Sequence, residues 1–172
     1  RVNLYGFEAG GHGIESGEHA VRLTPGAADL GLFQGAESYL LEDSEGQTKN
    51  TYSISAGLDY ASVGPEHAWL KDIGRVQYSY ATDDEAMSAF KDLCETEGII
   101  PAIESSHAVA GAYKAAPDLK AKGYTNPVIV VNISGRGDKD VATAGKWFGY
   151  LTDEQSKALE ANGAHGTSVD GE

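Results

Sequence analysis

Short apolar runs and longer stretches with helical spacing alternate along this chain of 172 residues. Four runs rich in β-branched, aromatic or aliphatic residues predict strands: 2–7, 75–80, 99–103 and 127–133. Each of the last three runs is followed by a stretch that predicts a helix: between Thr82 and Gly98, over 107–116 and over 140–150. This order predicts an α/β fold of three layers, with a mostly parallel open sheet and helices on both faces.

Local signals define the ends of two of these helices. Thr82 and Glu85 have the spacing of a capping box, and Gly98 provides a helix stop. Ser105 or Ser106 can cap the helix over 107–116, which Pro117 would end. Cys94 lies on the apolar stripe of the first helix, which favours a packed thiol over a nucleophile.

The other segments have weaker patterns. Glycine makes residues 10–19 a loop, residues 52–60 form another loop, and 65–70 suit a short helix. Residues 24–50 lack periodicity and allow a hairpin around Glu45-Gly46. We therefore expect one domain over 1–150 and a flexible acidic tail over 151–172.

Composition narrows the functional classes. The formal net charge is −13, with 26 acidic and 13 basic residues, which argues against nucleic acid or an anionic membrane as the main partner. A single cysteine excludes an internal disulfide. No apolar stretch approaches the roughly 18 residues of a membrane-spanning helix.

The most informative segment is Ser134-Gly135-Arg136-Gly137-Asp138-Lys139-Asp140, which follows the predicted strand 127–133. A strand that ends in a hydroxyl and two glycines before a helix is typical of a ligand site at the carboxyl edge of an open α/β sheet. Ser134 lacks the surroundings of a nucleophile elbow. Arg136 and Lys139 could bind phosphate, but the flanking aspartates favour local ion pairs.

Other ionisable residues leave two interpretations open. Glu104 could orient a ligand or act as a base, or it could be a helix-terminus carboxylate. Asp59 could serve in a site or in a turn. A metal site would need His12, Glu15, Glu18 and His19, which lie in a loop with no fixed register. His107 is expected to be packed rather than catalytic.

Taken together, these strings resemble the β chains of tryptophan synthase, pyridoxal-phosphate enzymes of fold-type II. The resemblance runs from residue 1 to about 150 and rests on five segments: 8–15, 52–60, 62–65, 98–107 and 131–140. It implies that residues 1–150 are the carboxyl-terminal part of an incomplete cofactor-binding domain.

The resemblance also implies residue roles. Ser134, with Gly135 beside it, would meet the pyridine nitrogen of the cofactor, and a neutral hydroxyl would not hold that nitrogen protonated. Glu104 would lie beside the cofactor ring, and Gly57 would make a backbone contact near it. Asp59 would meet the hydroxyl of the substrate serine.

Two further features follow from the same resemblance. The backbone carbonyls of Ala20, Tyr60 and Ser62 would bind a monovalent cation, Na⁺ or K⁺. Phe33 and Tyr60 would line a tunnel for indole. Ala20 and Tyr60 depart from the commoner residues at their positions, and this bears on the tunnel shape more than on carbonyl ligands.

The implied activity is that of a lyase in tryptophan biosynthesis, which makes L-tryptophan from indole and L-serine by β-replacement. The implied partners are the α chain and a second β chain in a homodimer, in the cytoplasm or, in a plant, a plastid. None of the nine lysines follows a histidine, as the family's Schiff-base lysine does, and the phosphate-binding loop is missing. We therefore expect a carboxyl-terminal piece of a β chain that is inactive alone.

Two alternatives remain. The chain could come from another β-replacing enzyme of the same class, similar to threonine synthase or cysteine synthase. It could also be a non-catalytic acidic binding module.

Overall fold

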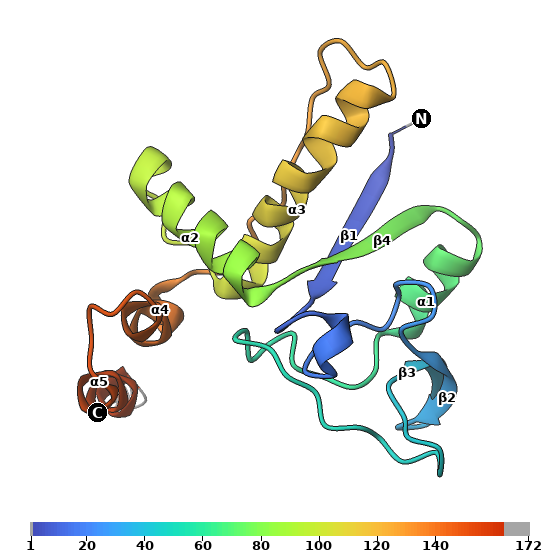
Figure 1. The fold of residues 1–172 in the computed structure, drawn as a ribbon, viewed down its shortest axis with the longest axis horizontal. Coiled ribbons are helices and arrows are strands. Elements are labelled where there is room, and N and C mark those ends of the chain that lie inside the picture. Colours follow the sequence, from blue (N-terminus) through green and yellow to red (C-terminus); the bar gives the residue numbers. More distant parts are fainter. Residues whose placement is uncertain (1, 164–172) are drawn as a thin grey trace, which may run out of the picture.

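The computed structural model describes residues 2–163. Strands β1 (Leu4–Ala9) and β4 (Val76–Ala81) pair in parallel, with Leu4 beside Val76 and Ala9 beside Ala81. Helix α2 (Asp83–Glu97) follows β4, and helix α3 (Ile103–Ala121) packs against both strands and against α2 (Figure 1). The α/β class expected from the sequence is confirmed.

A hairpin replaces the irregular structure expected over 24–50. Strands β2 (Asp29–Phe33) and β3 (Ala36–Leu40) are antiparallel. Gln34 and Gly35 form the turn between them, with φ of 51° and 81°. The turn expected at Glu45-Gly46 also forms, and Gly46 has φ of 76° there. Sequence periodicity missed the hairpin because β2 has no buried residue and the buried face of β3 includes the polar Ser38.

Five further elements complete the described chain. The first four are α1 (Pro65–Asp72), a 3₁₀ turn η1 (Ile14–Ser16), and a 3₁₀ turn η2 (Asp138–Asp140) that leads into α4 (Val141–Trp147). Helix α5 (Asp153–Gly163) then occupies a segment where the sequence predicted a flexible tail. Ser156 anchors this helix because its buried hydroxyl donates to the Ala142 carbonyl at 3.2 Å. The rest of that expected tail, 164–172, lies outside the described residues.

Two of the four predicted strands do not form. Residues 127–133 are without regular structure, and Val128 and Val130 are 90% and 89% exposed. A strand needs a neighbour for its N–H and C=O groups, and within residues 2–163 no strand pairs with this segment. Residues 99–102 run irregularly into α3, with only an isolated bridge between Pro101 and Arg136.

Helix α3 is longer at both ends than the sequence predicts. Its N-cap is Ala102, and the hydroxyl of Ser106 donates back to the Ala102 carbonyl at 3.2 Å. The first amide, of Ile103, donates instead to the carboxylate of Asp140 at 2.9 Å. Pro117 lies within the helix and does not end it. A cap supplied from 37 residues away cannot be read from local sequence.

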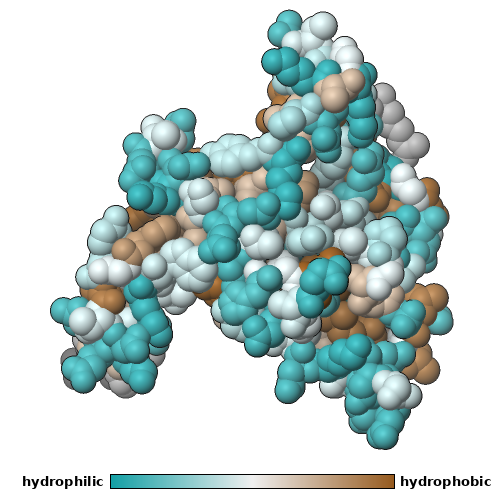
Figure 2. Space-filling view, in the orientation of Figure 1, coloured by the Kyte–Doolittle hydropathy of each residue, from teal (hydrophilic) through white to brown (hydrophobic). Residues whose placement is uncertain are grey.

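The core lies between the helices and the carboxyl end of β4. Its two clusters of buried residues are Ala81, Ala89, Val109 and Ala110, and Met87, Phe90, Ile103 and Ala144. The capping box of Thr82 and Glu85 and the left-handed Gly98 form as predicted. Figure 2 shows hydrophobic side chains, coloured brown, on the side of the molecule that carries α1, β2 and β3. Over residues 2–163, no helix has the length and apolar character needed to cross a membrane.

Candidate functional site

Glu104 joins three segments that are far apart in the sequence. Its Oε1 atom accepts the backbone amide of Gly57 at 3.0 Å, and its Oε2 atom lies 2.9 Å from the ammonium nitrogen of Lys139. A Cβ on Gly57 would lie 2.5 Å from Oε1, so this approach requires glycine. The loop 53–60, the start of α3 and the glycine motif therefore meet at one carboxylate.

Lys139 keeps this carboxylate ionised. Partial burial alone would raise the pKa of Glu104, but the hydrogen bonds and charge of Lys139, with smaller contributions from other hydrogen bonds, hold the pKa below its ordinary value. Burial alone would lower the pKa of Lys139. Its contacts with Asp140 and Glu104 outweigh burial and raise the pKa above its ordinary value. Glu104 is thus more than a locally satisfied helix-terminus carboxylate.

The glycine motif packs tightly against the start of α3. A Cβ on Gly135 would lie 2.8 Å from the Cβ of Ala102 and 4.0 Å from the hydroxyl oxygen of Ser105. The amide of Gly137 donates to the carbonyl of Ile100 at 3.1 Å. Ser134 directly precedes this contact and is exposed. Gly135, Glu104 and Gly57 are therefore brought together, and Ser134 is adjacent to them in the chain.

The Ser105 hydroxyl is buried, and no partner within residues 2–163 hydrogen-bonds to it. A buried polar group without a partner is costly in a protein interior. This hydroxyl lies beside Gly135 and next to Glu104 in the chain, where a ligand with a polar group could satisfy it.

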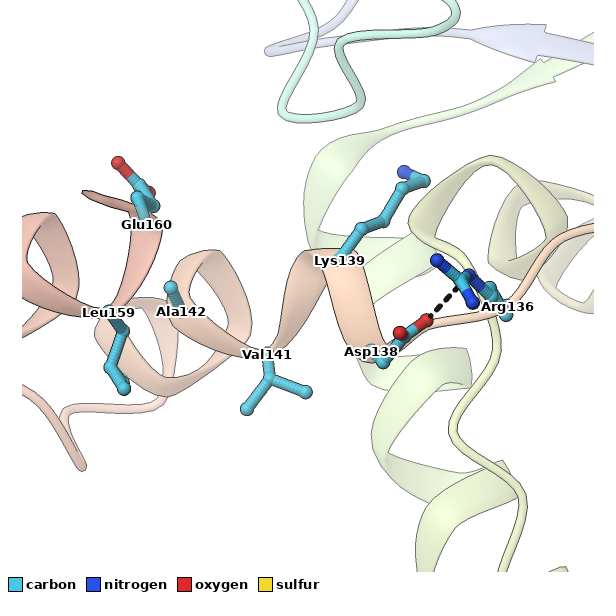
Figure 3. Close-up of a pocket in the computed structure, with 7 residues that line it drawn as sticks. All are labelled: Arg136, Asp138, Lys139, Val141, Ala142, Leu159 and Glu160. Atoms are coloured by element: carbon cyan, nitrogen blue, oxygen red, sulfur yellow. Dashed lines mark ion pairs between the residues drawn. The ribbon is translucent and has the colours of Figure 1, made fainter. Parts of the chain in front are cut away.

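Local ion pairs form along the glycine motif, as the flanking aspartates suggested. Arg136 lies 3.2 Å from Asp138, and Lys139 lies 2.8 Å from Asp140. A cavity of about 570 Å³ adjoins these residues and reaches Leu159 and Glu160 of α5. Figure 3 shows Lys139 pointing away from the Arg136–Asp138 pair. The sequence did not predict the contact of Lys139 with Glu104.

The loop 53–60 also carries the two residues expected to meet the substrates. Asp59 is exposed, two residues beyond Gly57. The ring of Tyr60 contacts the ring of Phe33 edge-on, with a centroid distance of 5.7 Å. The structure thus brings Phe33 and Tyr60 together from the hairpin and the loop.

Of the three residues expected to bind a cation, Ala20 is bonded to the end of β1 and Ser62 is bonded to β3. The amide of Ala20 donates to the Ala9 carbonyl at 3.0 Å, and the Ser62 hydroxyl donates to the Tyr39 carbonyl at 3.3 Å. The Tyr60 carbonyl accepts a hydrogen bond from the guanidinium of Arg22. That carbonyl is therefore already bonded to a cationic side chain.

A buried ion pair that sequence reasoning missed supports this region. Glu8 and Arg22 are 5% and 6% exposed, and their Oε1 and Nε atoms lie 2.9 Å apart. Glu8 also accepts the backbone amides of Arg22 and Leu23, at 3.1 and 2.7 Å. The sequence did contain a signal for this pair: Glu8 follows an apolar run, and Arg22 lies between Val21 and Leu23.

Three other residues that the sequence singled out, His12, His107 and Cys94, make packing or hydrogen-bond contacts within the fold. His12 bonds Glu18 through Nδ1 at 2.7 Å and packs on the ring of Tyr52. His107 is fully buried, and its Nδ1 donates to the Ile103 carbonyl at 2.8 Å. Burial lowers the pKa of His107 and raises that of the half-buried Cys94. His107 and Cys94 are thus packed, as predicted.

A pair of parallel strands with helices packed on it, and backbone and carboxylate groups gathered beside it, define an α/β protein with a candidate ligand site. No family model matches the chain. It is 62% identical over 150 residues to the tryptophan synthase beta chain of Mycobacterium tuberculosis, which covers 87% of this chain and 34% of the relative. It is 52% identical over 163 residues to that of Streptomyces coelicolor, covering 95% and 37%.

A third relative is the tryptophan synthase beta chain of Methylibium petroleiphilum, 57% identical over 142 residues, which covers 83% of this chain and 33% of the relative. The chain belongs to the family of tryptophan synthase β chains. It spans about a third of the length of the curated relatives it matches.

Proposed function

We propose that this chain supplies one wall of an active site that makes L-tryptophan and water from indole and L-serine. The observation that carries the proposal is the meeting of Gly57, Glu104 and Gly135 at the start of α3. These positions are the ones that the family resemblance assigns to cofactor contact, and they come from three separate segments. Identity of 52 to 62% with tryptophan synthase β chains supports the same activity.

The residues present fit pyridoxal phosphate. The buried Ser105 hydroxyl lacks a partner among the described residues, and the glycines allow close backbone approach on either side of Glu104. We propose that Ser134, Gly135, Glu104 and Gly57 hold one side of the cofactor. The Schiff-base lysine would come from outside this chain, because no lysine here follows a histidine.

The bound cofactor would supply the electron sink that β-replacement requires. Ser134 would offer its neutral hydroxyl to the pyridine nitrogen, without a charge that keeps the nitrogen protonated. Glu104 would present an ionised carboxylate beside the ring, held in place by Lys139. From its exposed position on the loop, the Asp59 carboxylate would accept a hydrogen bond from the hydroxyl of the substrate serine.

The finer features rest on the arrangement of the loop 53–60. Phe33 and Tyr60 would form part of a surface for indole, whose flat ring suits an edge-on aromatic pair. A carbonyl oxygen has two lone pairs, so the Tyr60 carbonyl could bind Na⁺ or K⁺ while it accepts from Arg22. Ala20 and Ser62 would supply the other carbonyls. The α chain, a second β chain and a cytoplasmic or plastid location complete the proposal.

A chimera tests this function. In it, the chain replaces the matching 150 residues of the Mycobacterium tuberculosis β chain. We expect the chimera to form L-tryptophan from indole and L-serine with bound pyridoxal phosphate. A folded chimera that uses sulfide in place of indole, or a phosphorylated homoserine in place of L-serine, would favour the relatives of cysteine or threonine synthase. A folded chimera with no β-replacement activity would overturn the proposal and favour a non-catalytic module.

A further inference from the structure

The loop 53–60 is held at two points by two different carboxylates. Glu104 accepts the amide of Gly57, and both carboxylate oxygens of Asp83 lie 3.2 Å from the amide nitrogen of Ile54. Asp83 is the first residue of α2, separated from the end of β4 by the N-cap Thr82, and is 1% exposed. The two contacts flank the turn that leads to Asp59.

Asp83 is not needed to cap its own helix. The capping box already satisfies that end, with the Glu85 amide donating to Thr82 at 3.3 Å and the Thr82 amide donating to Glu85 at 2.9 Å. The neighbouring Asp84 is exposed and provides a negative charge in the first turn. The carboxylate of Asp83 is directed instead to a loop 29 residues earlier in the chain.

Keeping Asp83 in this place has a free-energy cost. Burial raises its pKa, and the Ile54 amide, His107 of α3, His12 of the glycine-rich turn and Tyr52 only partly offset this. A hydrophobic residue there would avoid the cost. Buried carboxylates beside a ligand site at the end of a strand are candidates for functional roles.

We propose that Asp83 is a positioning residue for the loop 53–60. It fixes Ile54, so that Gly57 reaches Glu104 and Asp59 is carried at a constant place beside the site. The catalytic consequence of this assignment rests on the proposed function. The contact between Asp83 and the loop does not depend on it.

The test uses the chimera described above, with the variants Asp83→Ala and Asp83→Asn and the matched control Asp84→Asn. Hydrogen exchange of the 53–60 peptide is followed by mass spectrometry, and kcat and KM for L-serine are measured. Asp83→Ala should speed exchange of this peptide about tenfold or more, because it removes a hydrogen bond to a charged acceptor. The amides of α3 should exchange as before.

The kinetic result should follow the loop. Asp83→Ala should lower kcat/KM for L-serine by a similar factor, Asp83→Asn should restore part of it through its amide oxygen, and Asp84→Asn should change neither readout. Unchanged exchange and unchanged kcat/KM in a folded Asp83→Ala variant would overturn the proposal. Faster exchange with full kcat/KM would also overturn it, because the loop would then be held without effect on the reaction.

Two complications can be separated. If Asp83→Ala does not fold, Asp83→Asn decides: faster exchange over 53–60 and lower kcat/KM support the proposal, and unchanged values contradict it. If the unsubstituted chimera binds the cofactor but makes no tryptophan, the proposed function fails and the catalytic part of this inference fails with it. Exchange over 53–60 still reports whether Asp83 holds the loop.

Discussion

The carboxylate of Glu104 accepts the backbone amide of Gly57 at 3.0 Å, across 47 residues of sequence. This hydrogen bond and the ion pair with Lys139 fix the side chain between a loop and the glycine motif. A ligand at this place would meet a carboxylate whose position is set before the ligand binds.

Replacing Gly57 with alanine should therefore displace Glu104. The new Cβ would lie 2.5 Å from Oε1, and the flexible carboxylate would have to move. We expect the affinity of the chimera for pyridoxal phosphate, measured by fluorescence titration, to fall about tenfold, in line with the loss of one charge-assisted hydrogen bond. Gly64→Ala is the control, because its nearest neighbouring atom is 3.9 Å away. Equal affinities in the two variants would argue against this role of Gly57.

Removing Glu8 should be strongly destabilising. Glu8→Ala would leave the guanidinium of Arg22 buried without its carboxylate and would remove the acceptor of two backbone amides. The free energy of unfolding, measured in urea, should fall by about 3–5 kcal/mol. Glu18→Ala removes an exposed pair with His12 and should cost less than about 1 kcal/mol. A Glu8→Ala loss as small as that of Glu18→Ala would contradict the account of this ion pair.

The contact between α3 and β1 depends on Gly111. An ideal Cβ at this position would overlap the ring of Phe7. The helix can therefore pack this closely against the strand only with glycine. We expect Gly111→Ala to lower the free energy of unfolding by about 1–3 kcal/mol through overpacking. Thermal unfolding checks this, again with Gly64→Ala as the reference. An unchanged melting temperature would show that the ring can move aside freely.

The two carboxylates that hold the loop 53–60 should titrate with opposite effects on stability. Glu104 has a lowered pKa in the folded chain, so its carboxyl group is more fully protonated in the unfolded chain than in the folded chain. The free energy of unfolding therefore increases as the pH rises towards 4.5. Asp83 has a raised pKa in the folded chain, so its carboxyl group is more fully protonated in the folded chain than in the unfolded chain. The free energy of unfolding therefore falls as the pH rises above 3.8.

Variants separate these two effects. Relative to the unsubstituted chain, Glu104→Gln should lose stability as the pH rises to about 4.5, and Asp83→Asn should gain stability as the pH rises above 3.8. Urea unfolding at a series of pH values measures both differences. Parallel pH dependences of the two variants would be inconsistent with the opposite pKa shifts.

Local sequence predicted those elements whose determinants are local. The capping box at Thr82, the stop at Gly98 and the existence of strands β1 and β4 follow from patterns within a few residues. The prediction of a strand over 127–133 was wrong because a strand there needs a neighbouring strand, which the described residues do not supply. The start of α3 was misplaced because Asp140 caps it from another part of the chain.

The candidate site shows the same division. The glycine motif, Gly57 and Glu104 were found from short strings and from the family resemblance, and the structure brings them together. Lys139 as the partner of Glu104, Asp83 at Ile54 and the buried pair of Glu8 and Arg22 were missed. Each is a polar contact between distant segments, and no local pattern specifies its partner.

The most direct test of the proposed site is a crystal structure of the chimera with pyridoxal phosphate bound. The account predicts the Ser134 hydroxyl oxygen within about 3.2 Å of the pyridine nitrogen, and the Glu104 carboxylate beside the ring. A cofactor bound with its nitrogen facing another group, and with Ser134 still directed to solvent, would contradict it.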